Sequence, residues 1–175
     1  MTRVIGLGAD LINDVSAMTF DKKSIEVLVK EDTPVCLMHG GVNPEKMQEK
    51  INYDDVLFDV YDYLKEAINF AIAGGIKEEN ILIDPGIGFG KTSEQNMVLI
   101  QKASLFHSLG VPVLYGVSRK KFIGNIGGAQ APTSRFPGSI AVALELVRQG
   151  IQVIRVHDVK ETKQAFDLWG AIAKG

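Results

Sequence analysis

Five short apolar runs, each ending in polar or glycine residues, constrain the fold of this chain more than any other feature. Stretches with helical spacing separate them. Runs that are apolar on both faces and alternate with helices are typical of parallel β/α units. The five runs are DLINDVS (10–16), PVCLMHGG (34–41), ILIDPG (81–86), VPVLYGVSRK (111–120) and IQVIRVHD (151–158). Each ends in polar side chains, which predicts a common functional edge at the carboxyl ends of the strands.

Three of the intervening stretches are assigned to helices, over 54–75, 93–110 and 160–173. Asp158 and Glu161 predict the N-terminus of the last one. The first carries an apolar stripe and ends at Gly74 and Gly75. The stripe consists of Val56, Leu57, Val60, Leu64, Ile68 and Ile72.

The number of units decides between two α/β architectures for a single domain over 1–175. A doubly wound sheet normally carries a phosphate-binding turn after its first strand, and LINDVS has none. A (β/α)8 barrel has eight units and typically about 250 residues. Five units in 175 residues therefore predict a partial (β/α)8 TIM barrel from which about three units are absent.

Charge and cysteine content narrow the class of protein. The net charge of -2 argues against a nucleic-acid partner, and Lys91, Arg119, Lys120 and Lys121 fall in separate loops. The single Cys36 cannot form an internal disulfide, which favours a reducing cytoplasm, and it is expected to be a buried small hydrophobe. No apolar run reaches about 18 residues, so no membrane span is expected.

The stretch ILIDPGIGFGK (81–91) ends a buried strand with a carboxylate and places three glycines after it. A P-loop would need glycine at 85, where Pro85 has no N–H, and a dinucleotide fingerprint would need glycine at 91, where Lys91 stands. Two readings stay open. One is a turn without a ligand. In the other, Asp84 accepts paired N–H groups from a guanine-like or pterin-like ring beside Phe89. His39 is either a ligand contact or structural.

The motifs LINDVSA, CLMHGG with NPEKMQ, ILIDPGIGFGKT, LYGVSRKKFIG, SRFPGSIAVA and IRVHDVKET occur in this order. From about residue 8 onward they resemble the C-terminal part of the bacterial dihydropteroate synthase family, strands 4–8 of its (β/α)8 barrel. The resemblance implies a folate-pathway transferase that joins 6-hydroxymethyl-7,8-dihydropterin diphosphate to p-aminobenzoate, with sulfonamides as competitors. The alternative is a pterin-dependent methyltransferase. SRKKFIG and IRVHDV argue against it, because a methyl donor leaves no diphosphate to hold.

The resemblance also implies the roles of individual residues. Arg155 and His157 would hold the diphosphate, Ser118 and Arg119 would lie beside p-aminobenzoate, and Lys120, Arg155 and His157 would act in catalysis. A rigid, permanently charged arginine fork suits phosphate oxygens, and stabilising the departing charge would be the main contribution of the protein. The pterin pocket would use Asn13, Met38, Asp84, Phe89, Gly116 and Lys120.

Family members begin with a segment resembling GILNVTPDSFSDGG, which supplies the ligand of Mg2+ and a mobile loop. A second loop resembling GGESTRPG and an aspartate on the third strand follow. None of these occurs in this sequence. We therefore expect Mg2+ as a cofactor whose ligand lies outside this chain, and a homodimer or an association with an N-terminal half. The alternative function is that of a non-catalytic complementing or truncated pterin-binding fragment.

Overall fold

The computed structural model describes residues 1–40 and 52–174, in which five parallel strands follow one another in chain order. Strands β1, β2 and β3 form one sheet, and β4 pairs with β5. A single bridge from Ile83 to Val113 joins the two sheets. The strands are β1 (Ile12–Asp14), β2 (Val35–Met38), β3 (Ile81–Asp84), β4 (Leu114–Tyr115) and β5 (Val153–Ile154). The prediction of parallel strands from the five apolar runs is confirmed.

Seven α-helices accompany the strands in the described residues, and α3, α4 and α7 correspond to the three helices expected from the sequence. They are α1 (Thr2–Ile5), α2 (Ser24–Glu31), α3 (Val56–Ala73), α4 (Ser93–Gln101), α5 (Lys121–Gly127), α6 (Phe136–Arg148) and α7 (Val159–Lys174). Short 3-10 helices cover 78–80, 103–109 and 132–135. Local side chains fix two helix starts. Asp55 accepts hydrogen bonds from the N–H groups of Leu57 and Phe58, and Thr92 forms a capping box with Gln95.

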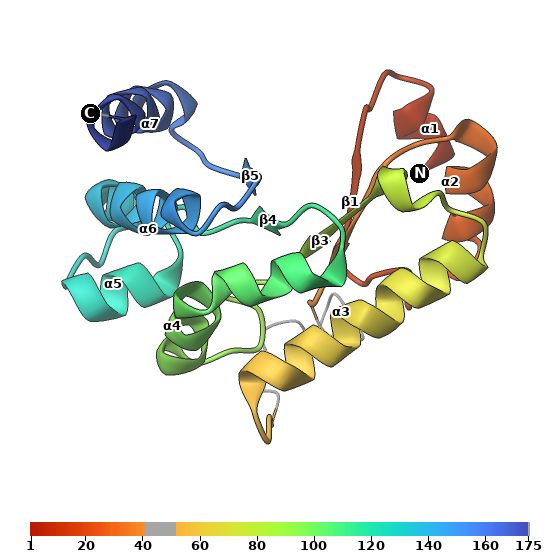
Figure 1. The fold of residues 1–175 in the computed structure, drawn as a ribbon, viewed down its shortest axis with the longest axis horizontal. Helices are drawn as coiled ribbons and strands as arrows, with labels where there is room; N and C mark the ends of the chain where they lie inside the picture. Colours follow the sequence, from red (N-terminus) through yellow and green to blue (C-terminus); the bar gives the residue numbers. More distant parts are fainter. Residues whose placement is uncertain (41–51, 175) are drawn as a thin grey trace.

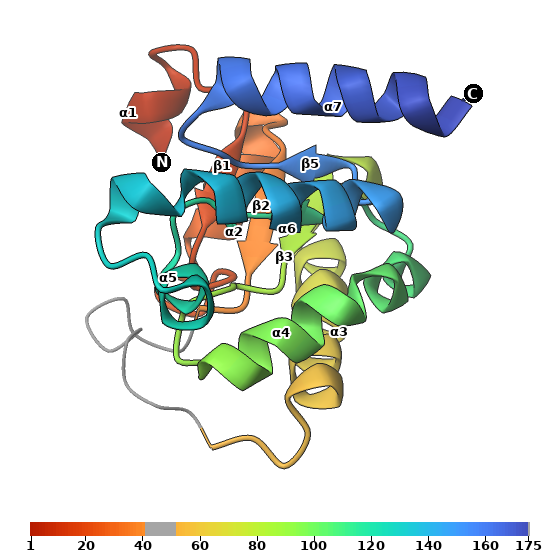
Figure 2. The same ribbon diagram turned by 90° about the vertical axis from the view of Figure 1, so that its left-hand side faces the viewer.

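The helices lie outside the curved row of strands, and the sheet is not closed (Figure 1). Strand β1, with α1 and α2, stands at one end of the row, and β5, with α6 and α7, stands at the other. Figure 2 shows α6 and α7 side by side, on the viewer's side of β5. Among the described residues each of the two end strands has one hydrogen-bonded neighbour, so β1 and β5 keep one free edge each.

The core lies between the strands and α3. Val60 and Leu64 of α3 pack with Ile81 and Ile83 of β3, and Phe106 closes the cluster; the exposed fraction of each is 0%. Cys36 is fully buried, as expected. Most of the predicted stripe of α3 is buried, but Ile72 is 42% exposed, and Ala67 and Ala71 take the inner face instead.

The predicted helix over 93–110 is interrupted. Helix α4 ends at Gln101, and a 3-10 helix from Ala103 to Leu109 follows. The N–H of Ser104 donates to the side-chain oxygen of Gln149, at 3.1 Å, and that side chain also reaches the carbonyl of Ile100. A long-range side chain therefore takes the place of helical bonding at this point. The expected motif NPEKMQ (43–48) lies outside the described residues.

Candidate functional site

The carboxyl ends of the parallel strands bring the predicted site residues to one edge of the sheet. Asn13 lies in β1, and Met38 is paired in register with Asp84 across β2 and β3. Ser118 and Lys120 follow β4. Arg155 and His157 were expected on the last strand, but β5 ends at Ile154, so both lie just beyond it. The side chain of Met38 is buried, whereas Asn13 is exposed.

Asp84 is a carboxylate in the interior, with only 3% of its surface exposed. Its Oδ1 accepts a hydrogen bond of 2.8 Å from the N–H of Gly86. Burial raises the pKa of Asp84 to about 6, while that N–H and the charges of Lys120, Lys91 and Arg155 act in the opposite direction. Three cations around a buried carboxylate provide the electrostatic support that an isolated buried charge lacks.

The glycines after Asp84 allow the loop to pass close to its neighbours. Gly86 has a φ of 71°, and a Cβ at this position would lie 1.9 Å from the carbonyl oxygen of His39. Gly88 has a φ of 80° and donates its N–H to Asn96 Oδ1 at 2.7 Å. A Cβ on Gly88 would approach Lys120 to 3.0 Å. Only glycine meets both demands of conformation and space here.

Lys91 turns back under this loop. Its Nζ lies 2.9 Å from Nδ1 of His39 and donates to the carbonyl oxygens of Gly86 and Phe89, both at 3.1 Å. Burial lowers the pKa of Lys91 to about 7, and the Asp84 carboxylate opposes that shift. Burial, reinforced by Lys91, lowers the pKa of His39 to about 3.

The ammonium group of Lys120 lies over the aromatic ring of Phe89 at the mouth of the site. The Nζ of Lys120 stands 3.9 Å from the centroid of the Phe89 ring, a cation–π contact. Both side chains are partly exposed. Burial lowers the pKa of Lys120, while Asp84 holds it up. The ring and the ammonium group thus form a wall of the site next to the buried carboxylate.

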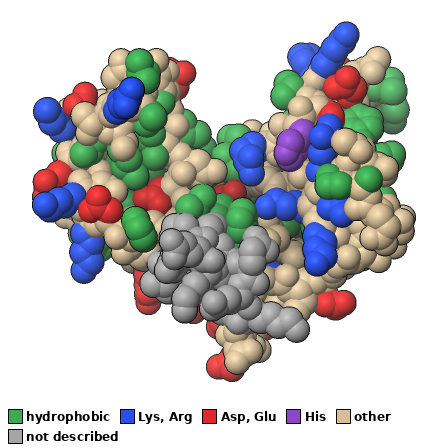
Figure 3. All heavy atoms as spheres, turned by 180° about the vertical axis from the view of Figure 1, so that it is seen from behind, with side chains coloured by type: hydrophobic (Ala, Val, Ile, Leu, Met, Phe, Trp, Pro, Cys, Tyr) green, Lys and Arg blue, Asp and Glu red, His purple; other side chains and the backbone are tan. Residues whose placement is uncertain are grey.

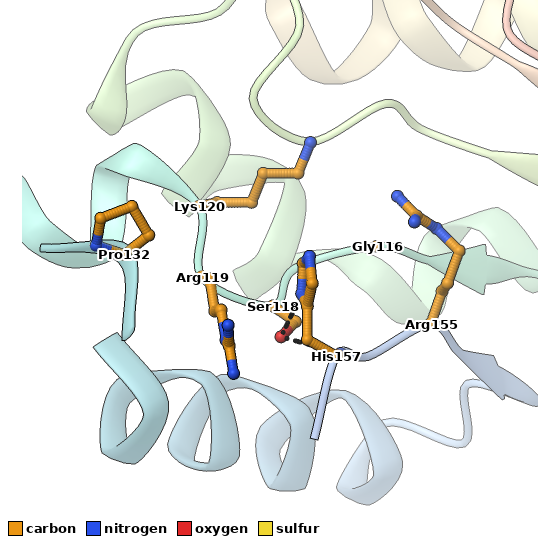
Figure 4. Close-up of a pocket in the computed structure, with 7 residues that line it drawn as sticks. All are labelled: Gly116, Ser118, Arg119, Lys120, Pro132, Arg155 and His157. Carbon is orange, nitrogen blue, oxygen red and sulfur yellow. Dashed lines mark hydrogen bonds between the residues drawn. The ribbon is translucent and has the colours of Figure 1, made fainter. Parts of the chain in front are cut away.

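Figure 4 shows that Lys120, Arg155 and His157 extend toward the same side of the chain. His157 is held by Ser118, whose Oγ lies 3.0 Å from Nδ1 and accepts the N–H of His157 at 3.3 Å. Gly116 leaves room for Arg155, because a Cβ there would lie 3.1 Å from its Nη2. Arg155 and His157 extend the same way in this view, although neither is part of β5.

Arg119 points away from Lys120 in the same view (Figure 4). Its φ of 58° turns the side chain toward Asp158, which accepts from Nε at 3.1 Å and from Nη2. Its carbonyl oxygen accepts from Arg135, and its N–H donates to Ser139. The guanidinium group predicted to lie beside p-aminobenzoate is thus engaged in an ion pair that links the turn after β4 to the turn before α7.

Two cavities meet at Lys120. The first, of about 370 Å³, is lined by Gly116, Ser118, Arg119, Lys120, Pro132, Arg155 and His157. The second, of about 600 Å³, lies between the start of α4 and α5 and shares Arg119 and Lys120 with the first. Its remaining lining includes Gly88, Lys91, Ser93, Lys121 and Asn125. In Figure 3 a hollow separates two lobes, and Lys, Arg and a His side chain gather on the wall formed by the α5–α7 half.

Sequence reasoning missed several residues that hold the site in place: Asn96, Arg135 and Asp158, and the inward orientation of Lys91. Among these residues, only Lys91 had a sequence feature that indicated a role in the site, namely its position directly after the glycine loop. In residues 1–40 and 52–174 no group of three or more His, Cys, Asp or Glu side chains forms a candidate metal site. Within the same residues, none of the helices is long and apolar enough to cross a membrane.

A buried carboxylate with three cations around it thus lies at the carboxyl edge of a parallel α/β sheet. The family model described as "Pterin binding enzyme" matches residues 1–157. The chain belongs to this pterin-binding family, and curated proteins similar to it include dihydropteroate synthases. That of Neisseria meningitidis serogroup C is 41% identical over 98% of this chain and 62% of its own length. That of Escherichia coli K12 is 42% identical over 91% and 56%.

Solved structures agree with this assignment. The dihydropteroate synthase of Stenotrophomonas maltophilia with active-site-bound imidazole superposes with a TM-score of 0.94 at 36% identity, covering 98% of this chain and 64% of that one. The Xanthomonas albilineans enzyme in complex with 7,8-dihydropteroate gives 0.90 at 37% identity (98% and 62%). The Yersinia pestis enzyme with a sulfonamide drug complex gives 0.92 at 38% identity (99% and 62%). The chain therefore spans less than two thirds of these relatives.

Proposed function

We propose that this chain is the part of a dihydropteroate synthase that binds the pterin and the diphosphate. The observation that carries the proposal is Asp84, a buried carboxylate at the end of β3. One of its oxygens already accepts the N–H of Gly86, so a lone pair of that oxygen and the whole second oxygen are left for a ligand. A pterin offers an amino group and a ring N–H side by side, which matches a carboxylate.

The remaining predicted residues complete a pocket for such a ring. Phe89 and Met38 provide apolar contact, Lys120 donates to ring heteroatoms, and Asn13 reaches the ring from the end of β1. Gly116 keeps the wall open for Arg155, whose Nη2 would lie 3.1 Å from a Cβ at that position. Support for this assignment comes from the convergence of these side chains at one edge and from the relative solved with 7,8-dihydropteroate.

The proposed chemical step is displacement at the pterin methylene carbon. The arylamine nitrogen forms the new C–N bond, the C–O bond to diphosphate breaks, diphosphate leaves with the electron pair, and the nitrogen releases a proton to water. Arg155 and His157 would stabilise the leaving diphosphate, with Ser118 holding His157 at 3.0 Å. An arylamine is already nucleophilic, so the main contribution of the protein is electrostatic.

The second substrate, p-aminobenzoate, is assigned to the larger cavity, which meets the first at Lys120. Arg119 would border it through its backbone and its aliphatic stem, because its guanidinium is paired with Asp158, and Ser118 would lie beside the substrate from the adjoining first cavity, which it lines. Sulfonamides would compete there, as the relative solved with a sulfonamide suggests. Mg2+ is implied by the family, but the described residues offer no cluster of ligands that fits it, and the roles given above belong to the side chains of this chain alone.

We further propose that a segment supplying the missing β/α units completes the barrel along the free edges of β1 and β5. An unpaired strand edge presents N–H and C=O groups that favour association. The free edges of β1 and β5 and the match to 62% and 64% of the length of the solved relatives support this partner. A homodimer formed by the same surfaces is the competing arrangement.

The decisive experiment combines the chain with pterin diphosphate and p-aminobenzoate, first alone and then with a polypeptide carrying the first three β/α units of the Escherichia coli relative. We expect 7,8-dihydropteroate and diphosphate in the mixture and little product from the chain alone. An Asp84→Asn chain serves as the control. No dihydropteroate in the mixture, together with methyl transfer in a parallel assay that supplies a methylated reduced pterin as donor, would reject this function in favour of a pterin-dependent methyltransferase.

A further inference from the structure

Lys91 is the most buried cation of the site, and the reaction proposed above does not use it. Its Nζ contacts four acceptors: Nδ1 of His39 at 2.9 Å, the His39 carbonyl at 3.4 Å, and the carbonyls of Gly86 and Phe89 at 3.1 Å. An ammonium group only donates hydrogen bonds. While Lys91 is charged, the His39 Nδ1 therefore accepts, which makes the imidazole neutral with its proton on Nε2.

These contacts determine which way the peptide groups of the loop point. With the carbonyls of Gly86 and Phe89 drawn toward Lys91, the N–H of Gly86 is free to bond Asp84 at 2.8 Å, and the N–H of Gly88 bonds Asn96 at 2.7 Å. The ring of Phe89 is left beneath Lys120. The pocket wall and the orientation of the Asp84 carboxylate therefore depend on one ammonium group that lies behind them.

His39 anchors the other end of the same arrangement. It is 6% exposed and directly follows β2, and its N–H donates to the carbonyl of Asp84 at 2.9 Å. The ring of Tyr63 from α3 packs edge-on against it, with centroids 4.7 Å apart. Lys91 thus ties the loop after β3 to the end of β2, the strand that carries Met38.

We infer that Lys91 is a positioning residue of the pterin pocket: through His39, Gly86 and Phe89 it sets the direction of Asp84 and Phe89 without touching the ligand. This inference rests on the proposed function. The charged and titratable groups around Asp84 and Lys91 are Lys120, Arg155 and His39, with Cys36, Tyr53 and Tyr115 at the periphery. Because the Lys91 charge lowers the pKa of Asp84, its removal raises that pKa.

The test compares Lys91→Met with Lys77→Met in the full chain. Methionine keeps the length and burial of the side chain and removes the charge and the donors. Lys77 pairs with Asp32 on the surface and precedes β3, whereas Asp84 stands at the opposite end of that strand. The affinity for 6-hydroxymethylpterin is measured by calorimetry from pH 5 to 8, with the titration of the free pterin subtracted, and folding is checked by circular dichroism.

We expect Lys91→Met to weaken the affinity at pH 6.5, where Lys91 is mostly charged and Asp84 mostly ionised, by about ten- to a hundredfold, comparable to the loss of one hydrogen bond to a charged group. We also expect the pH below which affinity falls to move upward, because Asp84 becomes protonated earlier. Lys77→Met should change neither. A folded Lys91→Met chain with unchanged affinity, or with an unchanged midpoint, overturns the inference, since a merely structural lysine does not move the midpoint.

A second measurement needs neither the variant nor a ligand. Nitrogen NMR of the imidazole groups in the wild-type chain should show His39 with an unprotonated Nδ1 and a protonated Nε2 at pH 6, where Lys91 is largely charged. A proton on Nδ1 rejects the Lys91 contact and the inference with it. If the wild-type chain fails to bind pterin while this spectrum is as expected, the proposed function of the isolated chain fails and the arrangement of Lys91 stands.

Discussion

At the scale of single residues, the site is organised around buried groups whose protonation depends on one another. Asp84 faces the pocket, Lys91 and His39 lie behind it, and burial displaces the pKa values of the three groups to about 6, 7 and 3, respectively. For His39, desolvation and the Lys91 charge lower the pKa in the same direction. Recognition and stability should therefore both respond to pH in the range where enzymes are assayed.

Asp84→Asn tests recognition directly. The amide nitrogen replaces an acceptor with a donor, so two donors face each other across the pocket. A hydrogen bond to a charged group is worth roughly 1.5–3 kcal/mol, so pterin affinity should fall by about one to two decades. Calorimetry with 6-hydroxymethylpterin and, separately, with diphosphate checks this. Diphosphate binding should be nearly unchanged, and equal pterin affinity in a folded variant would mean that the 84–91 loop is only a turn.

His39→Gln tests the effect of the buried imidazole on stability. The pKa of His39 is about 3 in the folded chain, against an ordinary value of 6.5, so the unfolded state binds more protons between these limits. The wild-type chain should therefore lose stability relative to His39→Gln as the pH falls from 6.5 toward 3. Urea unfolding of both proteins at several pH values measures this difference. The raised pKa of Asp84 increases the stability of the folded chain as the pH falls from about 6 to 3.8. This contribution is the same in both proteins and cancels in the comparison.

At the scale of elements, the loop between β3 and α4 does the most to shape the site. Gly86, Gly88 and Gly90 have φ values of 71°, 80° and 63°, which curl the chain so that Lys91 returns beneath it. Asn96, in the first turn of α4, then fixes the loop through Gly88. The geometry of the pocket therefore depends on left-handed glycines, and a side chain at the tightest of them should be costly.

Gly86→Ala and Gly128→Ala form a matched pair. Their φ values are nearly the same, 71° and 73°, but a Cβ at Gly86 would meet the His39 carbonyl, whereas nothing lies within 4 Å of one at Gly128. Both variants bear the strain of a left-handed alanine, about 1–2 kcal/mol, and Gly86→Ala adds overpacking of about 1–3 kcal/mol. Urea unfolding should show the larger loss for Gly86→Ala. Equal losses would mean that the loop relaxes freely and that its close approach to β2 is not required.

The sequence alone predicted the strands and the residues at their ends, because parallel strands bring their carboxyl ends to one edge whatever the details. It did not predict directions within turns. Arg119 and Lys120 are neighbours, yet a φ of 58° at Arg119 sends its guanidinium to Asp158, while Lys120 faces Phe89. Likewise the break after Gln101 depends on Gln149, which lies 48 positions later along the chain, and periodicity does not register such a contact.

At the scale of the whole molecule, the open sheet is the dominant feature. In the part of the chain that the structure describes, strands β1 and β5 each have one free edge, and apolar side chains are exposed on the elements beside them. Leu7 is 80% exposed next to β1, and Leu168 and Ile172 of α7 are 64% and 71% exposed. Exposed apolar surface of this kind, next to unpaired strands, favours association with another chain.

The isolated chain should consequently self-associate. The contact should involve the free edges of β1 and β5 and the exposed apolar side chains beside them. Replacing Leu168 and Ile172 of α7 with lysine should lower the sedimentation coefficient at high concentration. The matched control replaces Phe58 and Phe70 of α3, which are 58% and 42% exposed on the outer helix layer, and should leave it unchanged. Adding the complementing β/α units should suppress self-association of the wild-type chain, because both need the same edges. A wild-type chain that stays monomeric at every concentration would contradict the proposed partner surface.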